Sequence, residues 1–290
     1  MYDQCIANSL QQNSTDKYRN WMVSTDMSVK CVQDNNNAGL IPHKKNNRKI
    51  KKCDNDLLEY VEIISPIISI TNISQIYTVL QEGITQQFDF YSNSTTSNHV
   101  HMSCDVHFNN PDLLLKICSA WYYFEPVFFS LCNLSRQKNK FCRSMRSMIK
   151  GDAINTAKNL NNKSIDNIIN IFQGNLYSNR TTSLNLYNLK YHGATGTIEC
   201  RLKECCKDIR ELQGWVYLLA VFYCRAMSTN EIKKPDEKNI NEAFWKFIDE
   251  PSLELFWSLK RNKTPYFSRT NKVSSSIFEH LYLTIISKKS

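Results

Sequence analysis

Two short alternating segments constrain the fold of this chain more than any other feature. Apolar and polar side chains alternate along Ser183–Leu189, and again along Thr195–Leu202 after a turn that contains glycine. Because successive side chains of a strand point to opposite faces, such segments are typical of strands with one buried face. Together they predict an antiparallel pair of neighbouring strands.

Other short strands are predicted earlier in the chain. Trp21–Val32 has the pattern of two short strands around a turn, and Glu59–Ile64 has that of one strand. Apolar residues then recur at helical spacing over Ile73–Ile84, and His99–Phe108 alternates again. Runs of strands interrupted by single helices, without regular strand–helix alternation, predict an α+β fold with a mostly antiparallel sheet.

The most apolar segment, Leu113–Leu134, carries Lys116, Glu125 and Pro126 in its interior. Charged residues and a proline at these positions favour a buried helix, ended or kinked at Pro126, over a membrane span. The N-terminus lacks a basic region followed by an apolar stretch, so no secretory signal is predicted. We therefore expect a soluble, intracellular protein of the cytoplasm that does not bind membranes.

The domain plan follows from helical patterns nearer the C-terminus. Helices are predicted near Phe141–Ile149, Lys163–Phe172 and Asp208–Met227, and the remainder is helical with aromatic anchors. We predict a loosely ordered segment over residues 1–20, one domain over 21–228 and a helical layer over 229–290 that packs on the same core. With 42% hydrophobic residues in 290, the chain can bury a sizeable core.

The formal charge of +9 would attract anions, including nucleotides, acidic substrates and nucleic acids. The basic run His43–Lys52 is interpreted as a solvated loop, and nucleic acid is disfavoured as a partner because no stacking pattern accompanies the run. The seven glycines form no phosphate-binding or dinucleotide-binding loop. Asparagine runs indicate an AT-rich genome, and a viral or protist source is one interpretation.

The eleven cysteines are irregularly spaced and odd in number, which favours reduced thiols over a disulfide framework. Cys200, Cys205, Cys206 and Cys224 could form a metal cluster with His192. No CxxC pair supports that possibility, so buried or strand-facing thiols are preferred.

Two motifs place ionisable side chains on strand faces. His99-Val100-His101 puts two imidazoles on one face, which suits metal or phosphate binding but also occurs without a function. Glu199-Cys200-Arg201 pairs a carboxylate with a guanidinium, and a structural ion pair with a neighbouring strand is the alternative interpretation.

The order of these motifs along the chain is more specific than either motif alone. Six segments follow one another: Trp21 with Asp26-Met27-Ser28, Glu62-Ile63-Ile64-Ser65-Pro66, His99-Val100-His101, Arg136 with Asn139-Lys140-Phe141-Cys142, Arg180 with Leu184-Asn185-Leu186, and Thr197-Ile198-Glu199-Cys200-Arg201. This succession resembles the amidoligase family of ATP-dependent carboxylate–amine ligases over about Trp21 to Met227. The family is similar to glutamine synthetase and glutamate–cysteine ligase, and its sheet holds nucleotide, metals and substrate on a concave face.

The resemblance implies a reaction in two steps and a role for each matching residue. ATP phosphorylates a carboxylate, and an amine attacks the acyl phosphate to give an amide, in a peptide, protein or amino-acid-like acceptor. The implied cofactors are ATP and Mg²⁺, or Mn²⁺ in its place. The implied roles are metal binding for Glu62, His99 and Glu199, catalysis on the phosphates or substrate for His101, Arg180 and Arg201, and ATP or substrate binding for Arg136, Asn185 and Asp26.

Within this set, Arg136 would hold an anionic substrate group and Asn185 would orient a neighbour. Asp26 would contact the amine, or simply fix a turn, as aspartates often do.

The chain departs from the family pattern at its start. Amidoligases usually begin with a Gly-x-Glu-x-Glu strand whose glutamates bind metal, and no glutamate precedes Trp21. Glu59 or Glu62 could supply the ligand, the start of the gene could be missing, or the site could have lost catalysis. Thr96-Ser97-Asn98 also replaces the usual small or glycine-rich approach to the histidines. A catalytically degenerate protein that binds nucleotide or a partner is therefore the alternative function.

Overall fold

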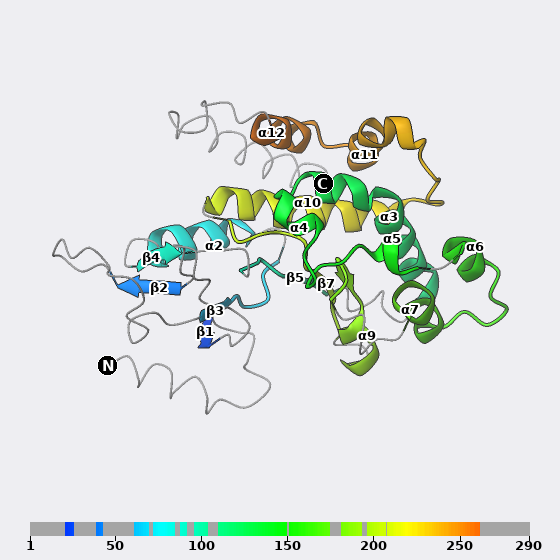
Figure 1. Ribbon diagram of the computed structural model, residues 1–290, viewed down its shortest axis with the longest axis horizontal. Helices are drawn as coiled ribbons and strands as arrows, with labels where there is room; N and C mark the ends of the chain where they lie inside the picture. The colour runs from blue at the N-terminus through cyan, green and yellow to red at the C-terminus, as the bar shows by residue number, and fades with distance from the viewer. Residues whose placement is uncertain are drawn as a thin grey trace. The chain divides into compact units, whose positions relative to one another are not determined.

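The computed structural model of the chain (Figure 1) describes residues 21–25, 39–42, 61–69, 72–84, 88–91, 96–103, 110–149, 151–174, 181–192, 196–206 and 208–261. The chain divides into two compact units, Met1–Ser97 with Cys205–Gln213, and Asn98–Glu204 with Gly214–Ser290. The domain bounds predicted after residues 20 and 228 are a separate matter and stay a prediction.

The first unit contains two antiparallel strand pairs and one helical segment. Its elements are β1 (Met22–Thr25), β2 (Gly39–Pro42), β3 (Val61–Ile64), α2 (Ser74–Tyr77), the π-helix η2 (Thr78–Ile84) and β4 (Phe88–Tyr91). β1 pairs with β3 and β2 with β4. The predicted strand before Ser65 and the helical segment up to Ile84 are both confirmed, and Ile76 and Leu80 are buried as their spacing predicts.

The second unit combines a three-stranded antiparallel sheet with most of the described helices. Its elements are β5 (Val100–Met102), α3 (Pro111–Ser130), α4 (Leu134–Gln137), α5 (Met145–Met148), α6 (Ala153–Lys158), α7 (Ile165–Gln173), β6 (Leu184–Asn185), α9 (Tyr187–His192), β7 (Ile198–Cys200), α10 (Ile209–Ser228, from Gly214 onward), η4 (Glu237–Asn239), α11 (Ile240–Ile248) and α12 (Pro251–Arg261). The strand order is β5-β7-β6, with both pairs antiparallel. The predicted α+β class is confirmed.

Helix α3 runs through Pro126, so of the two predicted alternatives, an end or a kink at this residue, the end is wrong. A proline inside a helix costs about 3 kcal/mol, because it lacks the N–H of one hydrogen bond and crowds the preceding turn. Phe124, Val127 and Phe128 are buried on either side of it, and each contributes roughly 1.5–3 kcal/mol on burial. Pro126 itself is exposed, so packing offsets the local cost.

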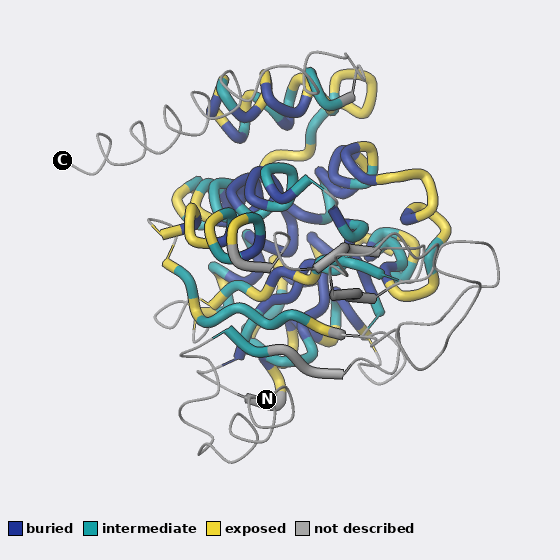
Figure 2. The backbone as a smooth tube through the Cα atoms, turned by 90° about the vertical axis from the view of Figure 1, so that its left-hand side faces the viewer, coloured by how far each residue is buried: buried dark blue, intermediate teal, exposed yellow. Residues whose placement is uncertain are grey.

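The helices of the second unit meet in an aromatic core. The ring of Phe128 lies 4.5 Å from that of Trp121, 4.9 Å from Phe222 on α10 and 5.1 Å from Phe244 on α11. Figure 2 shows how the buried residues gather along the helices. Among the helices that the structure describes, none is both long and apolar enough to cross a membrane.

A close approach joins α10 to α12. A Cβ atom at Gly214 would lie 2.7 Å from the ring of Phe256, which is too close for a carbon–carbon contact. Glycine therefore allows the two helices to pack together at this point.

A buried carboxylate ties α3 to the segment before β6. Glu125, only 1% exposed, accepts hydrogen bonds from Ser144 Oγ (2.5 Å), Met145 N (2.6 Å) and Arg146 N (3.0 Å), and also from Ser183 Oγ. Trp121 Nε1 donates to the same Ser183 hydroxyl at 3.0 Å. The carboxylate thus satisfies the main-chain donors at the start of α5 and holds Ser183 in place.

The predicted strand over Ser183–Leu189 is confirmed as the partner of β7, but it is shorter than its alternation predicts. β6 ends at Asn185 and α9 begins at Tyr187. The cause is local, since Asn185 Oδ1 accepts a hydrogen bond from Tyr187 N at 3.0 Å and turns the chain.

Candidate functional site

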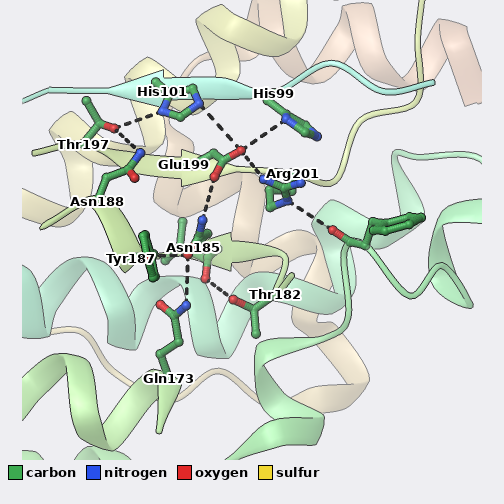
Figure 3. A network of polar contacts seen from close by, with 12 residues as sticks. His99, His101, Gln173, Thr182, Asn185, Tyr187, Asn188, Thr197, Glu199 and Arg201 are labelled. Carbon is green, nitrogen blue, oxygen red and sulfur yellow. Dashed lines mark hydrogen bonds and ion pairs between the residues drawn. The ribbon is translucent and has the colours of Figure 1, made fainter. Parts of the chain in front are cut away.

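A row of polar side chains crosses the sheet of the second unit. In the strand register, Glu199 on the central strand β7 lies opposite His101 on β5 and opposite Asn185 on β6. His99 directly precedes β5, two residues before His101, and Arg201 directly follows β7, two residues after Glu199, so both extend the same face of the sheet. All five side chains converge in Figure 3.

The opposite face of the same strands is apolar and buried. Val100, Leu184, Ile198 and Cys200 are at most 9% exposed. Because neighbours along a strand alternate between the faces, burial of this set directs the polar set to the other side.

Glu199 is the centre of the cluster. Its Oε1 accepts from Arg201 Nη1 at 2.5 Å and lies 3.2 Å from His99 Nδ1 and 3.6 Å from His101 Nε2. Its Oε2 accepts from Asn185 Nδ2 at 2.6 Å. With a side chain only 6% exposed, Glu199 is held from two sides in a setting where water competes little for these bonds.

Arg201 and Arg136 both contact main-chain carbonyls. Arg201 Nε donates to Phe141 O at 3.2 Å, which fixes the guanidinium in addition to its bond with Glu199. Arg136 is 2% exposed and donates to Leu202 O at 2.8 Å and to Arg201 O at 2.7 Å. These contacts let Arg136 support the strand that carries Arg201, and its predicted role in substrate binding stays a prediction.

The side chain of Thr197 orients His101. Thr197, two residues before Glu199, places Oγ1 3.0 Å from His101 Nδ1. Asn188 Nδ2 on α9 donates to the same hydroxyl at 3.3 Å. The imidazole of His101 is thus fixed on one side by Thr197 and faces Glu199 with its other nitrogen.

His99 is kept neutral by its surroundings. Burial and the nearby Arg201 guanidinium lower the pKa of His99 to about 4, although Glu199 acts in the opposite direction. A neutral imidazole that donates from Nδ1 to a carboxylate carries its lone pair on Nε2, which is the form that binds metals.

We expect His99 to titrate near pH 4 in the folded protein. The unfolded value is about 6.5, so the unfolded chain binds more protons between the two values, and stability falls as the pH is lowered through this window. NMR titration of the imidazoles, with His99→Gln to assign the resonance, measures the midpoint. A midpoint at 6.5 or above would contradict this electrostatic description.

The remaining predicted site residues lie in the first unit or outside the described residues. Glu62 lies on β3 of the first unit, opposite Ser24 in the strand register, and is exposed. Asp26, Arg180, Glu59 and the basic run at residues 43–52 are outside the described residues, so their predicted roles stay predictions. In the part of the chain that the structure describes, no group of three or more His, Cys, Asp or Glu side chains has the arrangement of a metal site.

Sequence reasoning missed two residues that contact the cluster. Thr197 directly precedes β7, two residues before Glu199 and therefore on the same face, so the two-residue period could have assigned it to the site. Gln173, the last residue of α7, donates to Asn185 Oδ1 at 3.0 Å and carries no local sequence signal.

Comparison with known proteins agrees with the order of the motifs. The family model described as "Putative amidoligase enzyme" matches residues 4–223, which extends upstream of Trp21. No curated protein and no solved structure matches the chain. Since the family model covers most of the sequence and includes every strand of the polar row, the chain belongs to the amidoligase family.

Proposed function

We propose that this protein is an ATP- and Mg²⁺-dependent carboxylate–amine ligase that forms an amide or isopeptide bond through an acyl phosphate. Membership of the amidoligase family indicates a ligase-type activity. The observation that supports the finer proposal is the row His101–Glu199–Asn185, flanked by His99 and Arg201 on one sheet face. It gathers the charge types that phosphoryl transfer requires.

In the first step, a carboxylate oxygen of the substrate forms a bond to the γ-phosphorus of ATP as the bond to the β,γ-bridging oxygen breaks. ADP leaves with that electron pair. Negative charge on the transferring group is stabilised by fixed cationic donors. Arg201 is suited to this role because Glu199 and Phe141 O hold its guanidinium in place.

In the second step, the amine nitrogen attacks the acyl carbon, and inorganic phosphate leaves with the electrons of the carbon–oxygen bond. The proton that the amine loses passes to the leaving phosphate, so the step yields a neutral amide and inorganic phosphate. His101 lies at the exposed edge of the row, with a side chain 45% exposed, and so can contact the phosphate or the attacking amine.

We assign His99 and Glu199 to separate divalent cations, because Glu199 faces Nδ1 of His99 and the metal-binding lone pair would lie on Nε2. His99 is neutral above about pH 4, as a ligand must be, and Glu199 is a fixed carboxylate. Bound Mg²⁺ would supply positive charge that neutralises the phosphates. Glu62 is proposed as a further carboxylate ligand on the strength of the family motif.

ATP turnover tests the proposal. The full chain is incubated with Mg²⁺ or Mn²⁺, ATP and a panel of carboxylates, peptides and amines, and ADP formation should require both substrates. With ¹⁸O in the substrate carboxylate, one labelled oxygen should appear in the released phosphate. ADP formed without that transfer would rule out the acyl phosphate.

The same ATP-turnover assay distinguishes the proposed ligase from the alternative function. A degenerate amidoligase-like protein would bind nucleotide, measurable by calorimetry, with no ADP formed for any substrate pair. That result would replace the ligase proposal by a binding role.

A further inference from the structure

Gln173 lies at the end of α7, outside every motif that relates the chain to its family. We infer that Gln173 is a positioning residue that acts through Asn185 to fix the rotation of the Glu199 carboxylate. The inference rests on the proposed function only in so far as Glu199 takes part in catalysis.

The orientation of the Gln173 side-chain amide follows from a main-chain group. Leu186 N donates to Gln173 Oε1 at 2.6 Å. A main-chain N–H is only a donor, so the atom that faces it must be the oxygen of the amide. The Nε2 group is thereby directed to its other neighbour, Asn185 Oδ1, at 3.0 Å.

Two hydrogen-bond donors fix the orientation of the Asn185 side-chain amide, by the same reasoning. Its Oδ1 accepts from Gln173 Nε2 and also from Tyr187 N at 3.0 Å. Two donors on one side require the oxygen there, so Nδ2 must point the other way, to Glu199 Oε2 at 2.6 Å. The two main-chain donors of Leu186 and Tyr187 thus determine that Asn185 offers Glu199 a donor (Figure 3).

Glu199 receives opposing donors as a result. Asn185 holds Oε2 and Arg201 holds Oε1, so the carboxylate cannot rotate without losing one bond. Oε1 is therefore kept toward His99 and His101. Gln173, Asn185 and Glu199 are 2%, 3% and 4% exposed, so water is a poor substitute for any of these partners.

The chain also fixes where Gln173 lies. Helix α7 ends at Gln173 because Gly174 has φ 59° and ψ −132°, a conformation that favours glycine. Gly174 N still donates to Asn170 O at 2.9 Å, which closes the last turn. The side chain of Gln173 is thus placed by a rigid helix end rather than by a loop.

The test uses Gln173→Glu and Gln173→Met in the full chain. Glutamate keeps the shape and the acceptor for Leu186 N but cannot donate to Asn185, and methionine removes both polar atoms. We expect kcat to fall about tenfold or more in each variant, while KM for ATP changes less than about twofold. Gln75→Glu, an exposed change of the same type on α2, is the matched control and should leave kcat unchanged.

NMR of the Asn185 side-chain amide gives a readout that does not need catalysis. The proton directed at Glu199 should resonate downfield in the wild type, and this shift should be lost in both Gln173 variants while circular dichroism stays native. Loss of the shift with no turnover in the wild type would sustain the positioning role and remove the proposed ligase. An unchanged shift and unchanged kcat in a folded variant would overturn the inference; if one variant fails to fold, the other decides.

Discussion

Replacing Glu199 with alanine is expected to lower kcat for ATP turnover about 10³-fold, because one side chain organises the whole polar row. Arg201, Asn185 and His99 all direct nitrogen atoms at its two oxygens. Without the carboxylate, the guanidinium loses the partner that, together with Phe141 O, fixes its position. Steady-state ADP formation with saturating substrates measures the effect.

Glu199→Gln is expected to fail as well, although it keeps the size of the side chain. Asn185 and Arg201 both offer donors, so the NH₂ group of a glutamine must face one of them. Glu231→Ala is the matched control, since Glu231 is an exposed carboxylate that pairs with Lys158 at 3.2 Å. Turnover in Glu199→Ala equal to that of this control would exclude the proposed mechanism.

Replacing Glu125 with alanine is expected to lower the free energy of unfolding by about 4 kcal/mol, the largest stability effect that we predict. The change leaves four donors without their acceptor, of which the main-chain N–H of Met145 and the hydroxyl of Ser183 are buried. Each buried donor left unpaired costs about 1–3 kcal/mol, and the two half-buried donors add less because water can reach them.

Urea denaturation followed by circular dichroism measures this loss. Glu242→Ala, an exposed carboxylate on α11, is the control, and its effect should stay within about 0.5 kcal/mol. If the two variants have the same midpoint, Glu125 does not hold α5 and Ser183 to α3 in the way described.

The sequence predicts much of the polar row because strand geometry is simple. The two-residue period places His99 with His101 and Glu199 with Arg201, whatever the rest of the fold does. Alternation around a turn also predicts that the strands of Asn185 and Glu199 pair. The alternation of polar and apolar residues does not predict the pairing register of these two strands. The register places Asn185 directly opposite Glu199.

Other features depend on contacts that are distant in sequence. Gln173 reaches Asn185 through the end of a helix, and no pattern near residue 173 marks that contact. Helix α3 continues through Pro126 because aromatic residues of α10 and α11 pack beside it. The end of β6 at Asn185 depends on one side-chain hydrogen bond, which competes with the strand pattern over the next residues.

Because β7 is the central strand of the sheet, its pairing register decides both whether the strands align correctly and whether the polar row forms. A shift of its pairing by one residue would turn Glu199 into the hydrophobic interior and bring Cys200 to the polar face. Such a misfolded chain would have to bury a carboxylate away from Arg201 and Asn185 and expose an apolar row. Mispaired molecules are therefore strongly disfavoured, and the same residues that would perform the reaction help the chain to select its native strand alignment.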